Sequence, residues 1–155
     1  MANFDPAQAV DVLMINQMIN SWAKELDDNN GLGTGPMVTQ DCAYSVPGNS
    51  YQGRAEVVKY YEDRLASLKA SAAGVPVHRH VISNLCVYFT AGDSAIVSFV
   101  MTYYTALSSL SGGSPVDPAL VGDGDMIVRR EEDGHWRIAR LDTEAVLVRT
   151  GGQVR

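Results

Sequence analysis

The segment VHRHVISNLCVYF, residues 77–89, decides how the rest of the chain is interpreted. β-Branched and aromatic residues fill it, and two of the three histidines stand near its start, so it predicts a strand. Alternation along a strand places His78, His80 and Asn84 on one face. The other face is largely apolar and includes Val81, Leu85, Val87 and Phe89. A buried imidazole needs a hydrogen-bond partner, so we expect the histidine face to form one wall of a pocket.

Around this strand, the chain divides into helices followed by strands. Apolar residues at spacings of three and four predict a helix from Pro6 to Asp27 or Asp28, and a second one from Gly53 or Arg54 to about residue 73. The later segments have a period of two and predict strands at 77–90, 94–107, 121–130 and 135–147; a shorter strand is expected at 42–46, closed by a turn at 47–49. Helices before a four-stranded antiparallel run indicate an α+β fold, with the helices packed on one face of a curved sheet.

The length of 155 residues suits one domain with a substantial core. We expect a single domain over residues 1–155, with a core at about 6–148 and a tail at 149–155. Residues 108–118 contain the sequence SGGSP and predict a flexible loop.

The composition excludes several kinds of partner. A net charge of −6 and the lack of a Lys/Arg cluster argue against nucleic acid and anionic membranes. No apolar run reaches the roughly 18–20 residues that span a bilayer, and no secretory signal is recognised, so we expect a cytoplasmic protein. Cys42 and Cys86 lie far apart and predict neither a disulfide nor a metal site; we expect both to be small buried side chains.

The segment 94–107 is apolar on both of its predicted faces. Helices that cover only one side of the sheet would leave the second face in water, and such a face usually meets another subunit. We therefore expect a homo-oligomer, either a dimer or a trimer.

Four short motifs follow one another in a distinctive order. The first helix ends in Leu26-Asp27-Asp28, the second opens with Gly53-Arg54, the central strand begins with His80-x-x-x-Asn84, and residues 133–140 read DGHWRIAR. Together they resemble the SnoaL-like branch of the nuclear transport factor 2-like superfamily, over about residues 10–147.

This resemblance implies a cone-shaped α+β fold in which a curved sheet and helices enclose an apolar pocket. Members include scytalone dehydratase, a bile-acid dehydratase, hexachlorocyclohexane dehydrochlorinase, polyketide cyclases and ketosteroid isomerase, as well as proteins that only bind or support others. Fold alone therefore does not define the activity. In the dehydratase and dehydrochlorinase members, an Asp at the end of the first helix pairs with the motif histidine. By position these residues are Asp27 and His80, and the motif arginine is Arg140.

A His–Asp pair in an apolar cavity suits elimination or isomerisation. The carboxylate accepts Nδ1–H, and the basic Nε2 then removes a proton beside a carbonyl or a leaving group, without a metal or an organic cofactor. The expected substrate is an apolar, ring-containing small molecule. The alternative is a non-catalytic small-molecule-binding protein, or an accessory subunit that resembles the β-subunits of ring-hydroxylating dioxygenases. A long His80–Asp27 distance or a filled pocket would favour that alternative.

Several assignments stay open at this stage. Asp28 could replace Asp27 as the partner of His80, although Asp27 directly follows the apolar residue Leu26. His78 is expected at the rim of the pocket or in solvent. If the last strand turns Arg140 toward the pocket, this arginine could anchor an anion or stabilise an oxyanion.

The competing role for Arg140 is a salt bridge to Asp125 or Glu144. The residues expected to line the pocket are Trp22, Tyr44, Tyr61, Asn84, Tyr103 and Asp125. At the position of Trp22, related dehydratases tend to have a Tyr or a Lys. The identity of the substrate and the direction of the reaction do not follow from these residues.

Overall fold

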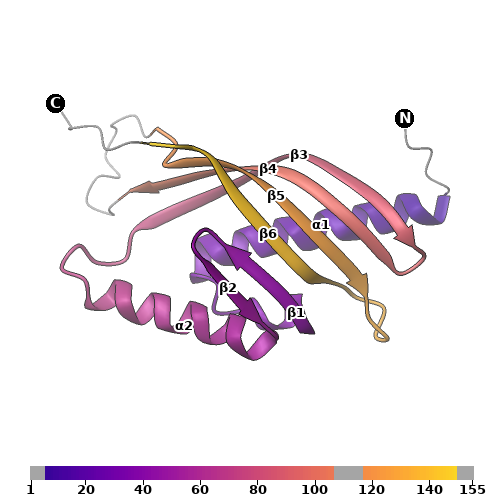
Figure 1. Ribbon diagram of the computed structural model, residues 1–155, viewed down its shortest axis with the longest axis horizontal. Coiled ribbons are helices and arrows are strands. Elements are labelled where there is room, and N and C mark those ends of the chain that lie inside the picture. Colours follow the sequence, from indigo (N-terminus) through magenta and orange to yellow (C-terminus); the bar gives the residue numbers. More distant parts are fainter. Residues whose placement is uncertain (1–5, 107–116, 150–155) are drawn as a thin grey trace.

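The computed structural model describes residues 6–106 and 117–149. Over these residues, two α-helices and a short 3₁₀ helix accompany one curved sheet of six strands, in the order β2-β1-β6-β5-β4-β3 (Figure 1). The elements are α1 (Pro6–Asn29), η1 (Gly35–Met37), β1 (Val38–Val46), β2 (Asn49–Gln52), α2 (Arg54–Ala70), β3 (Val77–Ala91), β4 (Ser94–Ala106), β5 (Leu120–Arg130) and β6 (Trp136–Val148). The predicted α+β fold is confirmed. Most of the predicted loop at 108–118 and all but the first residue of the predicted tail lie outside the described residues.

The two helices lie at different parts of the sheet (Figure 1). Helix α1 packs against β3 and β6, whereas α2 packs against β1 and β2. The hydrophobic core lies mainly between α1 and the sheet, where Ile15, Ile19 and Trp22 are almost completely buried. Burial of one such side chain stabilises the fold by about 1.5–3 kcal/mol, so α1 is held mainly by this apolar stripe.

The N-terminal edge of the sheet differs from the prediction. Residues 47–49 were expected to form a turn, but the turn itself is Pro47-Gly48, and Asn49 already pairs with Val46 as the first residue of β2. Gly48 has a φ of 84°, which glycine adopts at little cost. Strand β1 then pairs in parallel with β6, while the other neighbouring strands are antiparallel. The sheet is therefore mostly antiparallel, as expected, and β3 to β6 form the predicted four-stranded antiparallel run.

A β-bulge in the middle of β3 reverses the predicted faces of its second half. Asn84 has a φ of 52°, and the pairing with β4 shifts between Ser83 and Cys86. One extra residue in a strand exchanges its two faces, so Val87 points to the core and Cys86 to solvent. The expectation that Cys86 is buried is therefore wrong, whereas Cys42 is buried as predicted.

A second bulge lies in β6. Ile127 pairs with Arg140 and Val128 with Ile138, which leaves Ala139 as the extra residue. Before it, Trp136 and Ile138 point to the core; after it, Leu141 does so, with none of its surface exposed. Because of this bulge, the inward-pointing residues of β6 change from even-numbered to odd-numbered positions. The bulge therefore decides which residues of the last strand reach the interior.

Candidate active site

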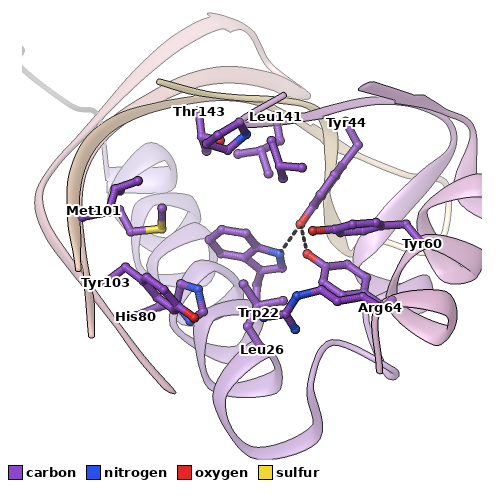
Figure 2. Close-up of a pocket in the computed structure, with 14 residues that line it drawn as sticks. Trp22, Leu26, Tyr44, Tyr60, Arg64, His80, Met101, Tyr103, Leu141 and Thr143 are labelled. Atoms are coloured by element: carbon purple, nitrogen blue, oxygen red, sulfur yellow. Dashed lines mark hydrogen bonds between the residues drawn. The ribbon is translucent and has the colours of Figure 1, made fainter. Parts of the chain in front are cut away.

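A cavity of about 240 Å³ lies between the two helices and the curved sheet (Figure 2). His80 and Tyr103 lie on one side of it, Tyr44 and Tyr60 on the other, and Trp22 between them. An apolar cavity of about 150 Å³ holds a benzene molecule, so this one has room for one or two rings. Its walls are largely apolar and aromatic and comprise Trp22, Leu26, Tyr44, Val46, Pro47, Tyr60, Tyr61, Arg64, His80, Met101, Tyr103, Leu120, Leu141 and Thr143.

The structure brings His80 and Asp27 together. The Nδ1 atom of His80 lies 2.7 Å from Oδ1 of Asp27, and the backbone N–H of His80 donates to both carboxylate oxygens, at 3.0 and 3.2 Å. The carboxylate can only accept, so Nδ1 carries the proton and Nε2 has the free lone pair. Within the described part of the chain, Nε2 has no hydrogen-bond partner. The imidazole is thus fixed in the tautomer that a general base requires.

The helical period explains why Asp27, rather than Asp28, is the partner. Asp27 follows Ala23 and Ile19 at steps of four residues, so it lies on the same buried face of α1. This face is directed toward β3, where His80 lies. Its side chain is only 9% exposed, whereas that of Asp28 is 49% exposed and pairs with Lys24.

The end of α1 is fixed by two residues in left-handed conformation. Asn30 and Gly31 have φ values of 55° and 82°, and Gly31 N–H donates to the carbonyl of Glu25. A Cβ atom on Gly31 would lie 2.3 Å from the ring of Tyr61, so the chain passes directly against this cavity residue. This tight end holds Asp27 in place opposite β3.

The protonation state of His80 follows from its surroundings. Burial lowers the pKa of His80 below its ordinary value of 6.5, the hydrogen bond to Asp27 partly opposes this shift, and the nearby Arg64 lowers the pKa further. The imidazole is therefore neutral at pH 7 and ready to accept a proton.

Three aromatic residues form a hydrogen-bonded chain at the opposite wall (Figure 2). The indole N–H of Trp22 donates to the Tyr44 hydroxyl at 3.0 Å, and the hydroxyls of Tyr44 and Tyr61 are 2.6 Å apart. Burial raises the pKa of both phenols, so both stay protonated. Their mutual bond uses one hydroxyl proton, and the other has no acceptor among the described residues. The cavity wall can therefore donate one hydrogen bond to a ligand oxygen.

His78 was expected at the rim of the pocket or in solvent. In the structure it is buried, with only 2% of its surface exposed. Its Nε2 lies 3.1 Å from Oδ1 of Asn30, and the Tyr103 hydroxyl lies 3.4 Å from its Nδ1. Asn30 thus accepts from Nε2–H, and Tyr103 donates to Nδ1. Burial lowers the pKa of His78, so it too is neutral. Both of its ring nitrogens are occupied, which leaves none for a ligand.

Three predicted site residues lie outside the cavity. The bulge at Ala139 turns Arg140 outward, where its side chain is 57% exposed and pairs with Asp142. The predicted salt bridge to Asp125 or Glu144 is replaced by this one. Asn84 is exposed because it forms the bulge of β3, and Asp125 is exposed because Gly124 and Met126 are the inward residues of β5. The predicted pocket roles of Arg140, Asn84 and Asp125 are corrected accordingly.

The cation at the cavity is Arg64 of α2, which the sequence interpretation missed. Arg64 follows Tyr61 by three residues and Val57 by seven, so it lies on the helix face that carries these two buried residues. A single arginine at those spacings was the available signal. Tyr60, Met101 and Leu141 were missed as well, and only their apolar or aromatic pattern pointed to the interior; Thr143, also missed, had no such signal.

Within the described ranges, no group of three or more His, Cys, Asp or Glu side chains is placed to hold a metal ion. In the same residues, neither helix is long and apolar enough to cross a membrane.

The comparisons with known proteins identify the family of the chain. The family model of the SnoaL-like domain matches residues 7–142. The chain belongs to the SnoaL-like family. This SnoaL-like protein is thereby also a member of the nuclear transport factor 2-like superfamily, as the motifs predicted. A search of curated proteins finds no match.

Solved structures similar to this SnoaL-like protein share its fold. A candidate scytalone dehydratase from Novosphingobium aromaticivorans DSM 12444 is 22% identical, with a TM-score of 0.74 over 96% of this chain and 92% of that one. A nuclear transport factor 2-like protein with a cystatin-like fold from the same species is 18% identical, with a TM-score of 0.71 and coverages of 90% and 84%. ActVI-ORFA from Streptomyces coelicolor is 13% identical, with a TM-score of 0.72 and coverages of 87% and 97%. At these identities, the likeness concerns the fold alone.

Proposed function

We propose that this protein is a cofactor-independent lyase or isomerase that acts on an apolar, ring-containing small molecule. His80 is the general base and Asp27 its orienting partner. The observation that carries the proposal is the 2.7 Å contact between His80 Nδ1 and Asp27 Oδ1, with Nε2 left free at an apolar cavity. The family and the candidate scytalone dehydratase are compatible with small-molecule binding and with lyase or isomerase chemistry in general.

The two walls of the cavity suggest how the reaction proceeds. A substrate carbonyl oxygen accepts a hydrogen bond from the free hydroxyl of the Tyr44–Tyr61 pair, and this bond stabilises the enolate as it forms. His80 Nε2 removes the proton from the carbon next to that carbonyl. A hydroxyl on the following carbon then leaves with the proton that His80 has gained. The products are an unsaturated ketone and water, and His80 returns to its neutral form.

Two observations weigh against the alternative of a protein that only binds. That alternative gains if His80 and Asp27 are too far apart to interact, or if side chains fill the pocket. Instead the two residues are hydrogen-bonded, and a cavity of about 240 Å³ remains. A passive binding site also has no need for an imidazole fixed with Nε2 unprotonated.

We further propose that a second copy of the chain covers the outer face of the sheet, which would give the dimer or trimer expected from the sequence. Tyr88, Ile96 and Ile127 are exposed on adjacent strands and pair in register across β3, β4 and β5. Sedimentation analysis of the full chain would measure the assembly directly.

The proposed reaction is tested with 3-hydroxy-1-tetralone, a two-ring β-hydroxy ketone that yields fluorescent 1-naphthol on loss of water. We expect turnover by the wild type and a loss of about 10²–10⁴-fold in His80→Gln. His135→Gln is the matched control, because His135 is exposed in the hairpin between β5 and β6 and should leave the rate unchanged. Equal turnover in wild type and His80→Gln would contradict the proposal.

A further inference from the structure

Arg64 stands out because it is a half-buried cation at an apolar cavity. It extends from α2 toward Trp22 and Leu26, and it lines the same space as His80 (Figure 2). Among the described residues, its guanidinium forms no hydrogen bond and no salt bridge. A guanidinium has five N–H donors, and removing them from water without partners is unfavourable.

The acidic residues near Arg64 are all engaged elsewhere or exposed. Asp27 accepts the ring and backbone N–H groups of His80. Asp63, next to Arg64 in α2, pairs with Lys59 at 2.6 Å, and Glu62 is exposed. Within the described residues, no carboxylate therefore forms an ion pair with Arg64. The low dielectric of an apolar cavity lets an unpaired charge act over a longer distance than in water.

The influence of Arg64 on its neighbours shows where the charge acts. Its positive charge lowers the pKa of both His78 and His80, and it opposes the burial that raises the pKa of Tyr60 and Tyr61. Three of these residues, His80 of β3 and Tyr60 and Tyr61 of α2, line the cavity together with Arg64. The positive charge of the guanidinium therefore acts on side chains that line the cavity.

We propose that Arg64 binds the carboxylate of the substrate and so selects ring-containing carboxylic acids over neutral rings. The planar guanidinium fork matches a carboxylate with two parallel hydrogen bonds, which a lysine or a hydroxyl does not provide. The rings lie against Trp22, Met101 and Leu141 in the apolar part of the cavity. This inference rests on the proposed function only in assigning the cavity to the substrate.

The geometry also separates Arg64 from Arg140. Both are arginines, but Arg140 is 57% exposed on the outer face and already pairs with Asp142. The anion-anchoring role considered for Arg140 from the sequence is therefore assigned to Arg64 of α2. Arg140→Met is accordingly the matched control for Arg64→Met, since the same charge is lost outside the cavity.

The test compares two ligands of nearly equal shape, 1-naphthoate and 1-naphthamide, by isothermal titration calorimetry of the full chain at pH 7 and low salt. We expect the wild type to bind 1-naphthoate about tenfold or more tightly than 1-naphthamide, because hydrogen bonds between two charged groups are stronger than those to a neutral amide. Arg64→Met should remove this preference by weakening 1-naphthoate alone, and Arg140→Met should keep it.

Retained binding of 1-naphthamide shows that Arg64→Met is folded, and Arg64→Lys, which keeps the charge, should retain part of the preference. The proposal is overturned if the wild type does not prefer 1-naphthoate, or binds neither ligand. It is also overturned if Arg64→Met keeps the preference or Arg140→Met loses it. Because binding is measured, a failure here is distinct from a failure of the proposed reaction, which is measured with an uncharged ketone.

Discussion

His78 and His80 lie two residues apart on the same face of β3, yet their surroundings differ in kind. Burial lowers the pKa of both, and both are neutral at pH 7. His78 contacts the Asn30 amide and the Tyr103 hydroxyl, which occupy both of its ring nitrogens. His80 contacts the Asp27 carboxylate through one nitrogen and keeps the other at the cavity. Burial and a lowered pKa are therefore common to both histidines; the carboxylate partner and the free nitrogen distinguish His80, which we propose as the general base.

The largest effect is expected when the carboxylate of the His80 site is replaced by an amide. In Asp27→Asn, the amide NH₂ can turn toward Nδ1 and favour the tautomer with the proton on Nε2, which cannot act as a base. We expect turnover of 3-hydroxy-1-tetralone to fall about 10²–10⁴-fold. Asp28→Asn is the matched control, because Asp28 pairs with Lys24 in solvent. A rate in Asp27→Asn equal to that of the control would contradict the assigned pair.

The reverse exchange gives His78 a carboxylate. In Asn30→Asp, the added negative charge should raise the pKa of His78 by about 1–2, measured by NMR titration of its ring protons. Turnover should not increase, because Tyr103 still occupies the second nitrogen of His78. A pKa of His78 that does not move would show that residue 30 is not its partner in solution.

Asn30 also contributes through its backbone, because its φ of 55° is unfavourable for most residues. Asn30→Ala loses the acceptor for His78 in a conformation that alanine disfavours, and we expect it to lower the free energy of unfolding by about 1–2 kcal/mol. Asn30→Gly loses the same acceptor but adopts this φ readily, so it should be about 1 kcal/mol more stable than the alanine variant. Urea denaturation measures both; equal stability of the two variants would contradict this account.

A smaller effect is expected from pH alone. Both histidines have pKa values in the folded protein below the ordinary 6.5, so the unfolded chain binds more protons as the pH falls through 6.5. The free energy of unfolding should be constant just above pH 6.5 and decrease below it, down to the folded pKa values. His80→Gln should remove part of this decrease. A decrease of the same size in His80→Gln and wild type would show that other groups cause it.

The sequence predicted the half of the site that depends on motifs and on helical spacing. Asp27, His80 and the pocket positions of Trp22, Tyr44 and Tyr61 follow from residues whose spacing α1, β3 and α2 preserve. The outward positions of Asn84 and Arg140 could not be predicted by alternation, because one bulged residue in each strand exchanges the faces. Asparagine favours positive φ, so Asn84 itself was the available sign of a bulge, whereas Ala139 offered none.

The most direct test of the central claim is proton abstraction by His80. In D₂O, 1-tetralone exchanges the hydrogens next to its carbonyl only when a base removes them, and ¹H NMR follows the loss of that signal. We predict that the wild type and His78→Gln accelerate this exchange well above the buffer rate, and that His80→Gln does not. Exchange at the buffer rate with the wild type, or undiminished exchange with His80→Gln, would contradict the assignment of His80 as the general base.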